Sequence, residues 1–436
     1  MKIQPDGVLI AGGGIGGLTL ALELHRLGVP CEVFESVASP SPIGVGITIL
    51  PHATRVLYEL GLSEALLARC IVATESYYYN RFGQFIYNEA VGRGAGVRWP
   101  QLSIHRADLY AVLLEAALER LGADRIHFGT RVLSAEDRGS FAVARVSTSA
   151  AEDGLDRGVR PLSDPPGDGA GSVDEIGGSA VIGCDGIHST LRRQLYPNEG
   201  EPIYQGINMW RGVTVHDPFL GGSSMLRVGW YPTGKLTIYP CRNDVDGQGR
   251  QLMNWIAAVE TPRHLDRDWG RQGRLEDFLD IFADWKFDFL DVPGVLTQAE
   301  SVLEFPMVDQ DPLPRWSFGR LTLLGDAAHP MVPRGSNGAG QAIVDCRALA
   351  ESLASRPDTV EALRAYDDQR RPATANVVYR NRANPPDAIL REVCQRSGDR
   401  PFADLDSLIT REELDALCEG YKDATGYSAK ALSAAE

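Results

Sequence analysis

The sequence predicts an α/β fold in which a parallel sheet flanked by helices carries a second unit built on an antiparallel sheet. A short apolar strand at 8–11 runs into a glycine-rich turn and a helix pattern, and another strand follows at 31–34. From 202 to 310 the pattern changes to alternating strands, interrupted by one helix predicted at 275–285, which indicates an antiparallel sheet. The 436 residues suffice for two or three domains.

The glycine-rich turn has the spacing of a dinucleotide-binding motif. Gly12, Gly14 and Gly17 fit G-x-G-x-x-G. The first glycine permits a tight turn, the second lets backbone approach a pyrophosphate, and the third lets the helix pack on the strand. Glu35 ends the next strand, about 20 residues further on, where a carboxylate can accept hydrogen bonds from a ribose. This Rossmann-like element predicts a dinucleotide site but does not separate NAD from FAD.

A second strand, turn and helix lie far downstream. A strand at 320–324 leads into Gly325 and Asp326, and a helix is predicted at 338–354. Asp326 is suited to accept hydrogen bonds from a sugar alcohol. Backbone N–H groups around Asn337, at the positive end of the helix dipole, suit the negative edge of a reduced flavin.

Arg106 lies at the start of a predicted helix that ends near Gly122. A cation is unfavourable at the positive end of a helix dipole. The simplest interpretation is a surface arginine. An anionic ligand at the same helix end would offset the unfavourable placement.

Composition excludes several classes of function. The net charge of −15 gives no general attraction to nucleic acid or to anionic membranes. The seven cysteines are scattered and none forms C-x-x-C, so we expect no disulfide framework, no metal site and a reducing compartment. No signal peptide is evident and no apolar run reaches the ~18 residues of a membrane span. We therefore expect a soluble cytoplasmic protein.

Three motifs together carry a resemblance to a known family. They are the glycine turn, Asp185-Gly186, and Gly325-Asp326 within GDAAHPMVPRGSNGAG. In this order they resemble the single-component FAD-dependent aromatic hydroxylases, the para-hydroxybenzoate hydroxylase-like family, over roughly residues 8–345. Segments such as SIHRADL, GCDGIHS and NMWRGVT are most similar to the phenazine-hydroxylating members.

The resemblance implies a role for each matching residue. Glu35 would hold the adenosine ribose, Arg106 would approach the pyrophosphate, and Asp326 would bind the ribityl or pyrophosphate region. Asn337 and Gly338 would line the carbonyl edge of the flavin. The implied cofactor-binding residues are Gly12, Gly14, Ile15, Gly17, Glu35, Gly46, Ile47, Arg106, Val132, Asp326, Asn337 and Gly338.

The same resemblance implies a substrate site. Asp185 would give structural support, and 330–333 would border the place where oxygen and substrate meet. Arg334 stands where close relatives more often carry a small or apolar residue, so it bears on substrate identity. The histidines are expected to be structural, and no catalytic acid or base is assigned. The aromatic residues of the antiparallel unit are a candidate lining for the same pocket. The predicted substrate-pocket residues are therefore Trp210, Tyr239, Pro333 and Arg334.

These observations predict a Rossmann-like FAD-binding domain with an inserted antiparallel-sheet substrate domain and C-terminal helices. An exposed loop is expected at 149–178, which is rich in Gly, Asp, Ser and Pro. The predicted division assigns residues 1–74, 102–198 and 314–375 to the FAD-binding domain, 75–101 and 199–313 to the substrate domain, and 376–436 to a C-terminal helical tail.

The family resemblance implies an oxidoreductase that uses NAD(P)H as a transient co-substrate and O2 to hydroxylate a small aromatic molecule, with a phenazine-like compound favoured, through a flavin C4a-hydroperoxide. A second G-x-G-x-x-G is absent from the sequence, in keeping with transient NAD(P)H. The alternatives are a salicylate-type decarboxylating hydroxylase, for which carboxylate-anchoring arginines such as Arg211 or Arg334 would argue, an FAD dehydrogenase that does not use oxygen, and a non-enzymatic flavin binder. The family also includes homodimers.

Overall fold

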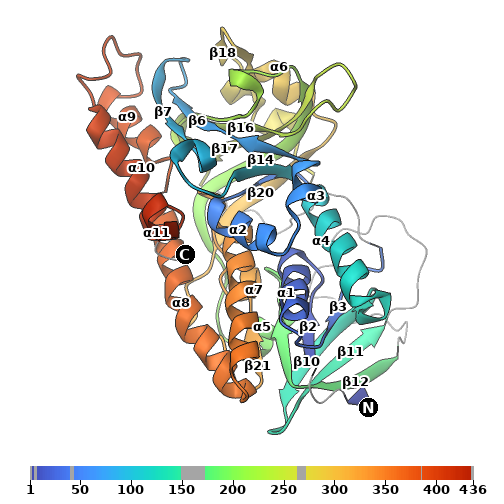
Figure 1. Cartoon of the computed structure of the whole chain (residues 1–436). Helices are drawn as coiled ribbons and strands as arrows, with labels where there is room; N and C mark the ends of the chain where they lie inside the picture. The colour runs from blue at the N-terminus through green and yellow to red at the C-terminus, as the bar shows by residue number, and fades with distance from the viewer. Residues whose placement is uncertain are drawn as a thin grey trace.

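The computed structural model describes residues 7–39, 44–148, 172–262, 272–383 and 385–433, together with the backbone of 2–3. A five-stranded sheet forms the centre of its lower half, as oriented in Figure 1. All neighbouring strands of this sheet are parallel. In sheet order, the strands are β21 (Leu321–Leu323), β13 (Ala180–Gly183), β2 (Val8–Ala11), β3 (Cys31–Phe34) and β9 (Ile126–His127).

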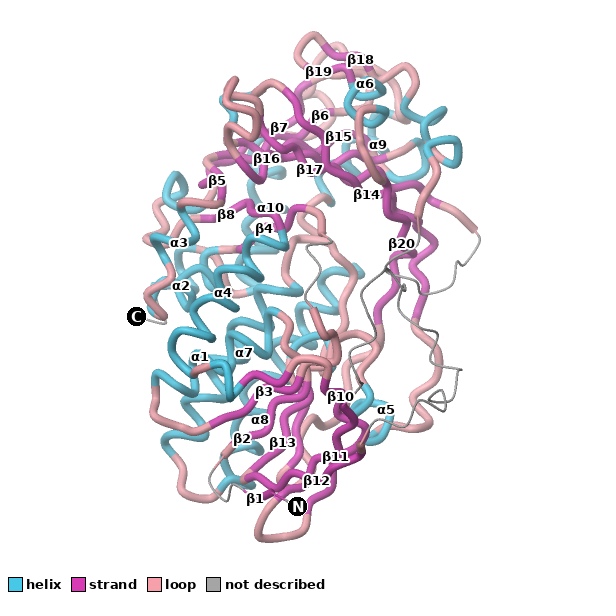
Figure 2. The backbone as a smooth tube through the Cα atoms, turned by 90° about the vertical axis from the view of Figure 1, so that its right-hand side faces the viewer, coloured by secondary structure: helices cyan, strands magenta, loops and turns pink. Residues whose placement is uncertain are grey.

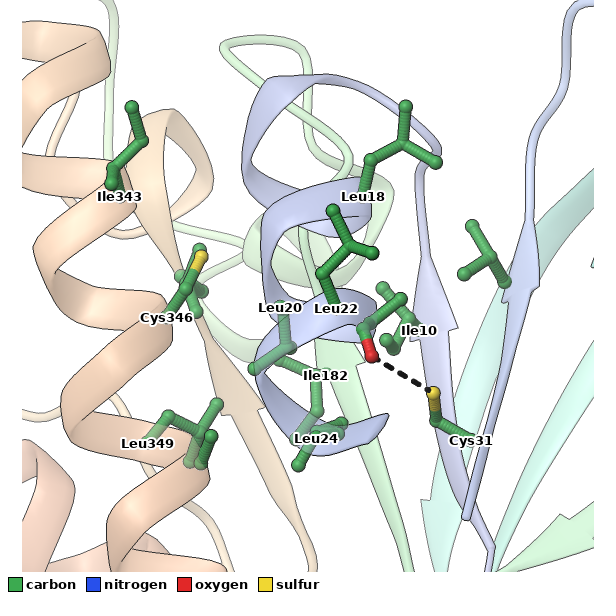
Figure 3. Close-up of a cluster of buried hydrophobic side chains, with 14 of the residues drawn as sticks. Ile10, Leu18, Leu20, Leu22, Leu24, Cys31, Ile182, Ile343, Cys346 and Leu349 are labelled. Carbon is green, nitrogen blue, oxygen red and sulfur yellow. Dashed lines mark hydrogen bonds between the residues drawn. The ribbon is translucent and has the colours of Figure 1, made fainter. Parts of the chain in front are cut away.

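Helices cover one face of the parallel sheet. Helix α1 (Ile15–Arg26) packs between α4 (Arg106–Leu121) and α7 (Gly338–Ser355). Figure 3 shows leucines of α1 between β2 and α7, where Leu18, Leu20, Leu22 and Leu24 are fully buried. Truncating one of them to alanine would cost about 2–5 kcal/mol, because a buried cavity would remain.

A four-stranded sheet covers the opposite face (Figure 2). Residues 173–178, expected to be part of an exposed loop, form its strand β12, so that part of the prediction is wrong. The strand pairs antiparallel with residues 142–147, and its last two glycines are buried. Residues 149–171 lie outside the described part of the chain. The sheet order is β1 (Lys2–Ile3), β12 (Val173–Gly178), β11 (Ala142–Thr148) and β10 (Thr130–Asp137).

The upper half of the molecule in Figure 1 contains a seven-stranded sheet, which confirms the expected antiparallel unit. Its one parallel pair joins β15 to β6, and the other pairs are antiparallel. In order, the strands are β20 (Val302–Asp309), β14 (Ile203–His216), β17 (Gln251–Glu260), β16 (Lys235–Arg242), β15 (Ser224–Gly229), β6 (Glu75–Tyr79) and β7 (Phe85–Ala90).

The helix expected at 275–285 is instead two short 3₁₀ turns, η5 (Leu275–Asp277) and η6 (Leu279–Phe282). Phe278 interrupts them with an extended φ of −145°. Phe278, Phe282 and Trp285 are buried against the large sheet, so tertiary packing overrides the local helix pattern.

Three strands and two helices connect the two halves. An antiparallel three-stranded sheet of β4 (Gly46–Ile49), β8 (Gln101–His105) and β5 (Cys70–Ala73) carries the chain between them, with α2 (Pro51–Glu59) and α3 (Ser63–Leu67) alongside. The small elements are α5 (Thr190–Leu195), α6 (Val292–Thr297), β18 (Lys286–Phe287), β19 (Leu290–Asp291), η1 (Gly92–Ala95), η2 (Ala123–Arg125), η3 (Leu220–Gly222), η4 (Tyr231–Thr233) and η7 (Gly325–Ala327).

The C-terminal region consists of helices, as the sequence predicted. Helix α8 (Thr359–Ala383) accommodates Pro372 in its interior and runs past residue 375, where the tail was predicted to begin. Helix α10 packs on both α8 and α9, so these helices brace the two halves on one side (Figure 1). The last helices are α9 (Ala388–Ser397), α10 (Arg411–Thr425) and α11 (Ala429–Ser433). Among the described helices, none is long and apolar enough to span a membrane.

Candidate flavin and substrate site

The glycine turn before α1 has the geometry that its spacing predicts. Gly12 has φ +101°, and a Cβ there would lie 2.4 Å from the carbonyl oxygen of Cys184. A Cβ on Gly17 would lie 1.9 Å from the carbonyl oxygen of Gly12, so this contact between helix and turn requires glycine. A Cβ on Gly14 would meet nothing within 4 Å. Space is therefore open beside the start of α1, where a phosphate-bearing ligand can approach the backbone.

Glu35 lies beside this turn at the end of β3. One carboxylate oxygen accepts a 2.7 Å hydrogen bond from the N–H of Gly13, and the other accepts one of 2.7 Å from the N–H of Val37. The side chain is half-buried. The oxygen bonded to Val37 also accepts from the hydroxyl of Ser36 at 3.3 Å. These bonds fix the orientation of the carboxylate, and the oxygen bonded to Gly13 keeps a further lone pair for a sugar hydroxyl.

The second turn, η7, presents Asp326 next to the start of α7. Asp326 is exposed between buried neighbours, and a Cβ on Gly338 would lie 3.9 Å from its Oδ1. Although solvent reaches the carboxylate, crowding by surrounding protein raises its pKa, while His329 and Arg106 act in the opposite direction. The downstream half of the predicted site therefore comes close to Arg106, which lies far away in sequence.

Helix α7 begins without a side-chain cap, although Asn337 occupies its N-cap position. The Asn337 side chain is engaged elsewhere. Its Nδ2 donates to the hydroxyl of Tyr421 at 2.8 Å and to the carbonyl of Gly335 at 3.2 Å, and its Oδ1 accepts from Gln341 at 3.3 Å. The backbone N–H groups of the first turn are left for a ligand, at the positive end of the helix dipole.

Ser336, next to Asn337, has φ +58°, and Gly335 before it has φ +69°. The left-handed conformation is uncommon for a residue with a Cβ and occurs where the surroundings impose it. The conformation of this turn is therefore imposed by the surrounding protein and not by the local backbone preference of Ser336.

Gly46, at the start of β4, is held on both sides by the large sheet. Its N–H donates to Oδ1 of Asn254 at 2.8 Å, and its carbonyl accepts from Nη2 of Arg211 and the hydroxyl of Tyr239, both at 2.9 Å. A Cβ there would lie 2.5 Å from Cβ of Asn254. Ile47 follows, half-buried. Two parts of the chain are thus joined at a predicted cofactor contact.

Arg106 is the first residue of α4 and is exposed. Its N–H donates to the carbonyl of Val45 at 3.0 Å, and a Cβ on Gly44 would lie 3.2 Å from its Cβ. Its guanidinium forms no ion pair or hydrogen bond with the described residues, whereas Asp108 on the same helix is paired with Arg242.

The other predicted support and cofactor residues occupy distinct positions. Asp185 accepts from the hydroxyl of Ser189 at 2.5 Å and from the N–H of Thr190 at 2.7 Å, so it anchors the start of α5. Ile15 is the first residue of α1. Val132 has its side chain in the core, next to a β-bulge in β10, so only its backbone is available to a ligand.

These features fit FAD. Two helix starts without side-chain caps, an open glycine position and a free guanidinium suit a diphosphate. Glu35 and Asp326 are hydrogen-bond acceptors suited to the hydroxyls of ribose and ribitol.

A cavity that is open to solvent lies between the seven-stranded sheet and the turn before α7. Three of the four predicted pocket residues line it, and Trp210 does not. Trp210 lies on the other face of β14 and stacks on Phe278 with ring centroids 4.9 Å apart, because side chains alternate along a strand. Its neighbour Met209 faces the cavity instead. Six lining residues are Met209, Met225, Tyr239, Met307, Pro333 and Arg334.

His329 is buried and belongs to a polar network behind the turn. Nε2 of His329 lies 2.5 Å from Oδ2 of Asp345, and Nε of Arg370 donates to Oδ1 of Asp345 at 2.6 Å. Arg370 also donates to Gln341 at 2.7 Å. All four residues are buried. The expected structural role of His329 agrees with this placement.

Comparison with known proteins places this geometry in a family. The FAD binding domain family model matches residues 7–220 and 290–381. Phenazine 1,6-dicarboxylic acid hydroxylase PhzS of Lysobacter antibioticus is 43% identical over 86% of this chain and 89% of that protein. 3-Amino-4-hydroxybenzoate 2-monooxygenase PtnB3 of Streptomyces platensis is 32% identical over 86% of each chain.

Solved structures agree in fold. Klebsiella pneumoniae HpxO complexed with FAD and uric acid superposes with a TM-score of 0.73 and 22% identity, covering 98% of this chain and 97% of that chain. The confirmed fold is a Rossmann-like FAD-binding unit with an antiparallel-sheet unit and C-terminal helices. The chain is an oxidoreductase with FAD as its cofactor, and it belongs to the FAD-dependent aromatic hydroxylases.

Proposed function

We propose that this enzyme hydroxylates a carboxylated phenazine or a similar flat heteroaromatic acid, with NAD(P)H as transient reductant. The observation that carries the proposal is the cavity beside the start of α7, lined by methionines, Tyr239 and Arg334. Met209, Met225 and Met307 contribute apolar, adaptable surface that suits a planar ring system. The 43% identity to a phenazine dicarboxylic acid hydroxylase supports the same substrate class.

In this proposal the cofactor is held from both ends of the chain. The glycine turn at 12–17 and Arg106 would hold the diphosphate, with Ile15 and the backbone of Val132 nearby. Glu35 would hold the adenosine ribose and Asp326 the ribityl region. Asn337, Gly338, Gly46 and Ile47 would offer backbone to the ring system. FAD supplies hydride acceptance and oxygen activation, and the protein supplies orientation and exclusion of water.

Tyr239 and Arg211 would orient Gly46 toward the ring system. Burial raises the pKa of Tyr239 to about 12, although Arg211 acts to lower it. Tyr239 therefore stays protonated at neutral pH and keeps donating to the Gly46 carbonyl. Pro333 would border the reacting atoms, and the substrate carries its own ring activation.

We also infer the domain division given above, with an FAD-binding domain of three segments and an inserted substrate domain. The sharing of one sheet by β6, β7 and the strands between 203 and 309 supports it. We infer that Asp185 acts by anchoring α5, and that a homodimer would be compatible with this arrangement.

Decarboxylating hydroxylation is the second candidate, because Arg334 lines the cavity and is suited to hold a carboxylate. Arg211, the other arginine considered for this role, donates to Gly46. Release of one CO2 per turnover would distinguish this reaction from simple hydroxylation.

The test is the flavin absorbance of purified protein, followed by NADH and NADPH consumption in air with phenazine carboxylates and hydroxybenzoates. We expect substrate-stimulated turnover and an oxygenated phenazine product identified by mass spectrometry. Hydroxylation of benzoates alone, or peroxide as the sole product with every phenazine acid, would overturn the proposed substrate class.

A further inference from the structure

The cavity is lined by more cationic than anionic side chains. Arg227 on β15, Lys235 on β16, Arg334 before α7 and Asp387 before α9 all line it. A small adjoining cavity shares Arg227 and adds Glu89 and Lys422. The two cavities together therefore present four cations and two carboxylates.

Each carboxylate is paired with a lysine, and Oδ1 of Asp387 is buried without a hydrogen-bond partner in the described chain. Asp387 forms a buried ion pair with Lys235 and also accepts from the hydroxyl of Tyr231 at 3.3 Å. Glu89 lies 2.7 Å from Nζ of Lys422. The two arginines are the cations in excess.

Neither arginine has a carboxylate partner among the described residues. Nη1 of Arg227 donates to the hydroxyl of Tyr78 at 3.3 Å. Nη1 of Arg334 donates to the carbonyl of Asn381 at 3.3 Å, and its Nε is buried without a hydrogen-bond partner in the described chain. The Arg334 guanidinium lies 4.9 Å from the ring centre of Tyr231. Both side chains are half-buried, so water solvates them incompletely.

Both guanidinium groups are half-buried and keep unused N–H donors, which an anion entering the cavity can occupy. Each is a planar fork that matches a carboxylate through two parallel hydrogen bonds. Neighbouring charges keep Arg227 protonated: burial acts to lower its pKa, but Tyr78, Glu89 and Asp387 together raise it above its usual range.

We propose that Arg227 and Arg334 form two separate carboxylate subsites, so that the preferred substrate is a flat aromatic dicarboxylate rather than a monocarboxylate. This inference rests on the proposed function and deepens it. The three methionines would contact the ring faces between the two anionic groups. A monocarboxylate would engage one arginine and leave the other without an anion.

The test measures binding to the FAD-loaded enzyme by calorimetry, without NAD(P)H. The probes are phenazine-1,6-dicarboxylate and phenazine-1-carboxylate, and the proteins are wild type, Arg227→Gln, Arg334→Gln and the exposed surface control Arg193→Gln. We expect wild type to favour the dicarboxylate by at least about tenfold. Each cavity variant should lose about tenfold or more for the dicarboxylate, whereas the monocarboxylate should be weakened by only one of them. The surface control should resemble wild type.

Flavin content and thermal midpoint identify any variant that fails to fold. Arg334→Lys keeps the charge but loses the planar guanidinium, and it then serves as the second variant, for which we expect a partial loss of dicarboxylate affinity. Equal weakening of both acids by both variants would indicate general attraction of anions and overturn the inference. Equal wild-type affinity for the two acids would also overturn it, even if phenazine monocarboxylate is hydroxylated and the proposed function holds. Failure to hydroxylate any phenazine acid would instead count against the proposed function.

Discussion

The hydroxyl of Tyr421 accepts a 2.8 Å hydrogen bond from Nδ2 of Asn337 and donates one of 2.6 Å to Oδ1 of Asn381. All three residues are buried. One phenol therefore joins the C-terminal helix α10 to the turn before α7 and to the end of α8. A Cβ on Gly335 would lie 2.0 Å from the same oxygen, so the turn is packed directly against it. The C-terminal helix supports the proposed flavin-facing backbone.

Replacing Tyr421 with phenylalanine should weaken FAD binding. The change leaves the buried amide of Asn337 and the buried oxygen of Asn381 each without this partner, at a cost of about 1–3 kcal/mol per unsatisfied group. We expect a lower free energy of unfolding of the apoprotein in urea and an increased dissociation constant for FAD by fluorescence titration.

Tyr427→Phe provides the matched control for this prediction. Tyr427 follows the same helix and stacks on His52, and its hydroxyl forms no hydrogen bond with the described residues. It should retain wild-type FAD affinity. Equal loss in both variants would mean that the Tyr421 hydroxyl has no specific role in positioning the turn.

Local motifs explain why much of this fold and site could be predicted from sequence. The glycine turn and Asp185 each follow a strand and precede a helix within a few residues, and Asp326 lies in the helical turn that follows a strand, so their geometry is encoded nearby. The unfavourable position of Arg106 at the start of a predicted helix was likewise recognisable from the local sequence. Those elements are observed where the patterns predicted them.

Long-range contacts explain what could not be predicted. The Asn254–Gly46 bond spans 208 residues and the Tyr421–Asn337 bond spans 84, and no local pattern encodes either pairing. Trp210 was assigned to the cavity because it is aromatic, but strand register decides which face a side chain occupies. Arg227 carried no signal beyond its position in a strand.

Substitutions at two glycines of the first turn should have different effects, one on protein stability and the other on FAD affinity. Gly17→Ala places a methyl group 1.9 Å from the Gly12 carbonyl, and we expect marked destabilisation from overpacking, typically about 1–3 kcal/mol or more. Gly14→Ala meets no protein atom within 4 Å and has an extended φ of −75°, so apoprotein stability should change by less than about 1 kcal/mol.

The Gly14→Ala methyl group would instead enter the space proposed for the diphosphate. FAD affinity should therefore fall in a protein that remains folded, as measured by titration of apoprotein alongside urea denaturation. Full FAD affinity in Gly14→Ala would contradict the proposed position of the diphosphate at this turn.

Asn254→Ala should increase the fraction of NAD(P)H that yields peroxide. The substitution removes the acceptor for the buried Gly46 N–H and opens space beside the loop, at a cost of about 1–3 kcal/mol in stability. A looser loop would admit water to the reacting atoms. The measurement is peroxide formed per NAD(P)H consumed at saturating substrate.

Asn208→Ala controls for the loss of a buried amide in the same sheet. Asn208 is buried on β14 and donates to Glu304 at 3.1 Å. It should cost stability without raising the peroxide fraction. An equal rise in peroxide in both variants would mean that general loosening of the sheet, rather than the Gly46 contact, controls coupling.

Protonation of Asp345 should lower the free energy of unfolding in acid. Burial alone would raise its pKa, but Arg370 and His329 bring it below the usual value. A depressed folded-state pKa stabilises the protein fully above the unfolded value of about 4, and this contribution is lost as pH falls through the folded pKa. Asp345→Asn removes a buried ion-paired charge, so we expect a loss of roughly 3–5 kcal/mol at pH 7 and a shallower decline below pH ~4.

Urea denaturation of the apoproteins between pH 7 and 3 measures this difference, with Asp423→Asn as the control because Asp423 is exposed and has no ion pair among the described residues. The wild-type and Asp345→Asn stabilities should converge as the pH falls, since protonation removes from the wild type what the substitution has already removed. A gap that stays constant down to pH 3 would mean that the Asp345 charge does not contribute to the acid sensitivity. The cost of the substitution would then come from packing and hydrogen bonding in the His329–Asp345–Arg370 network.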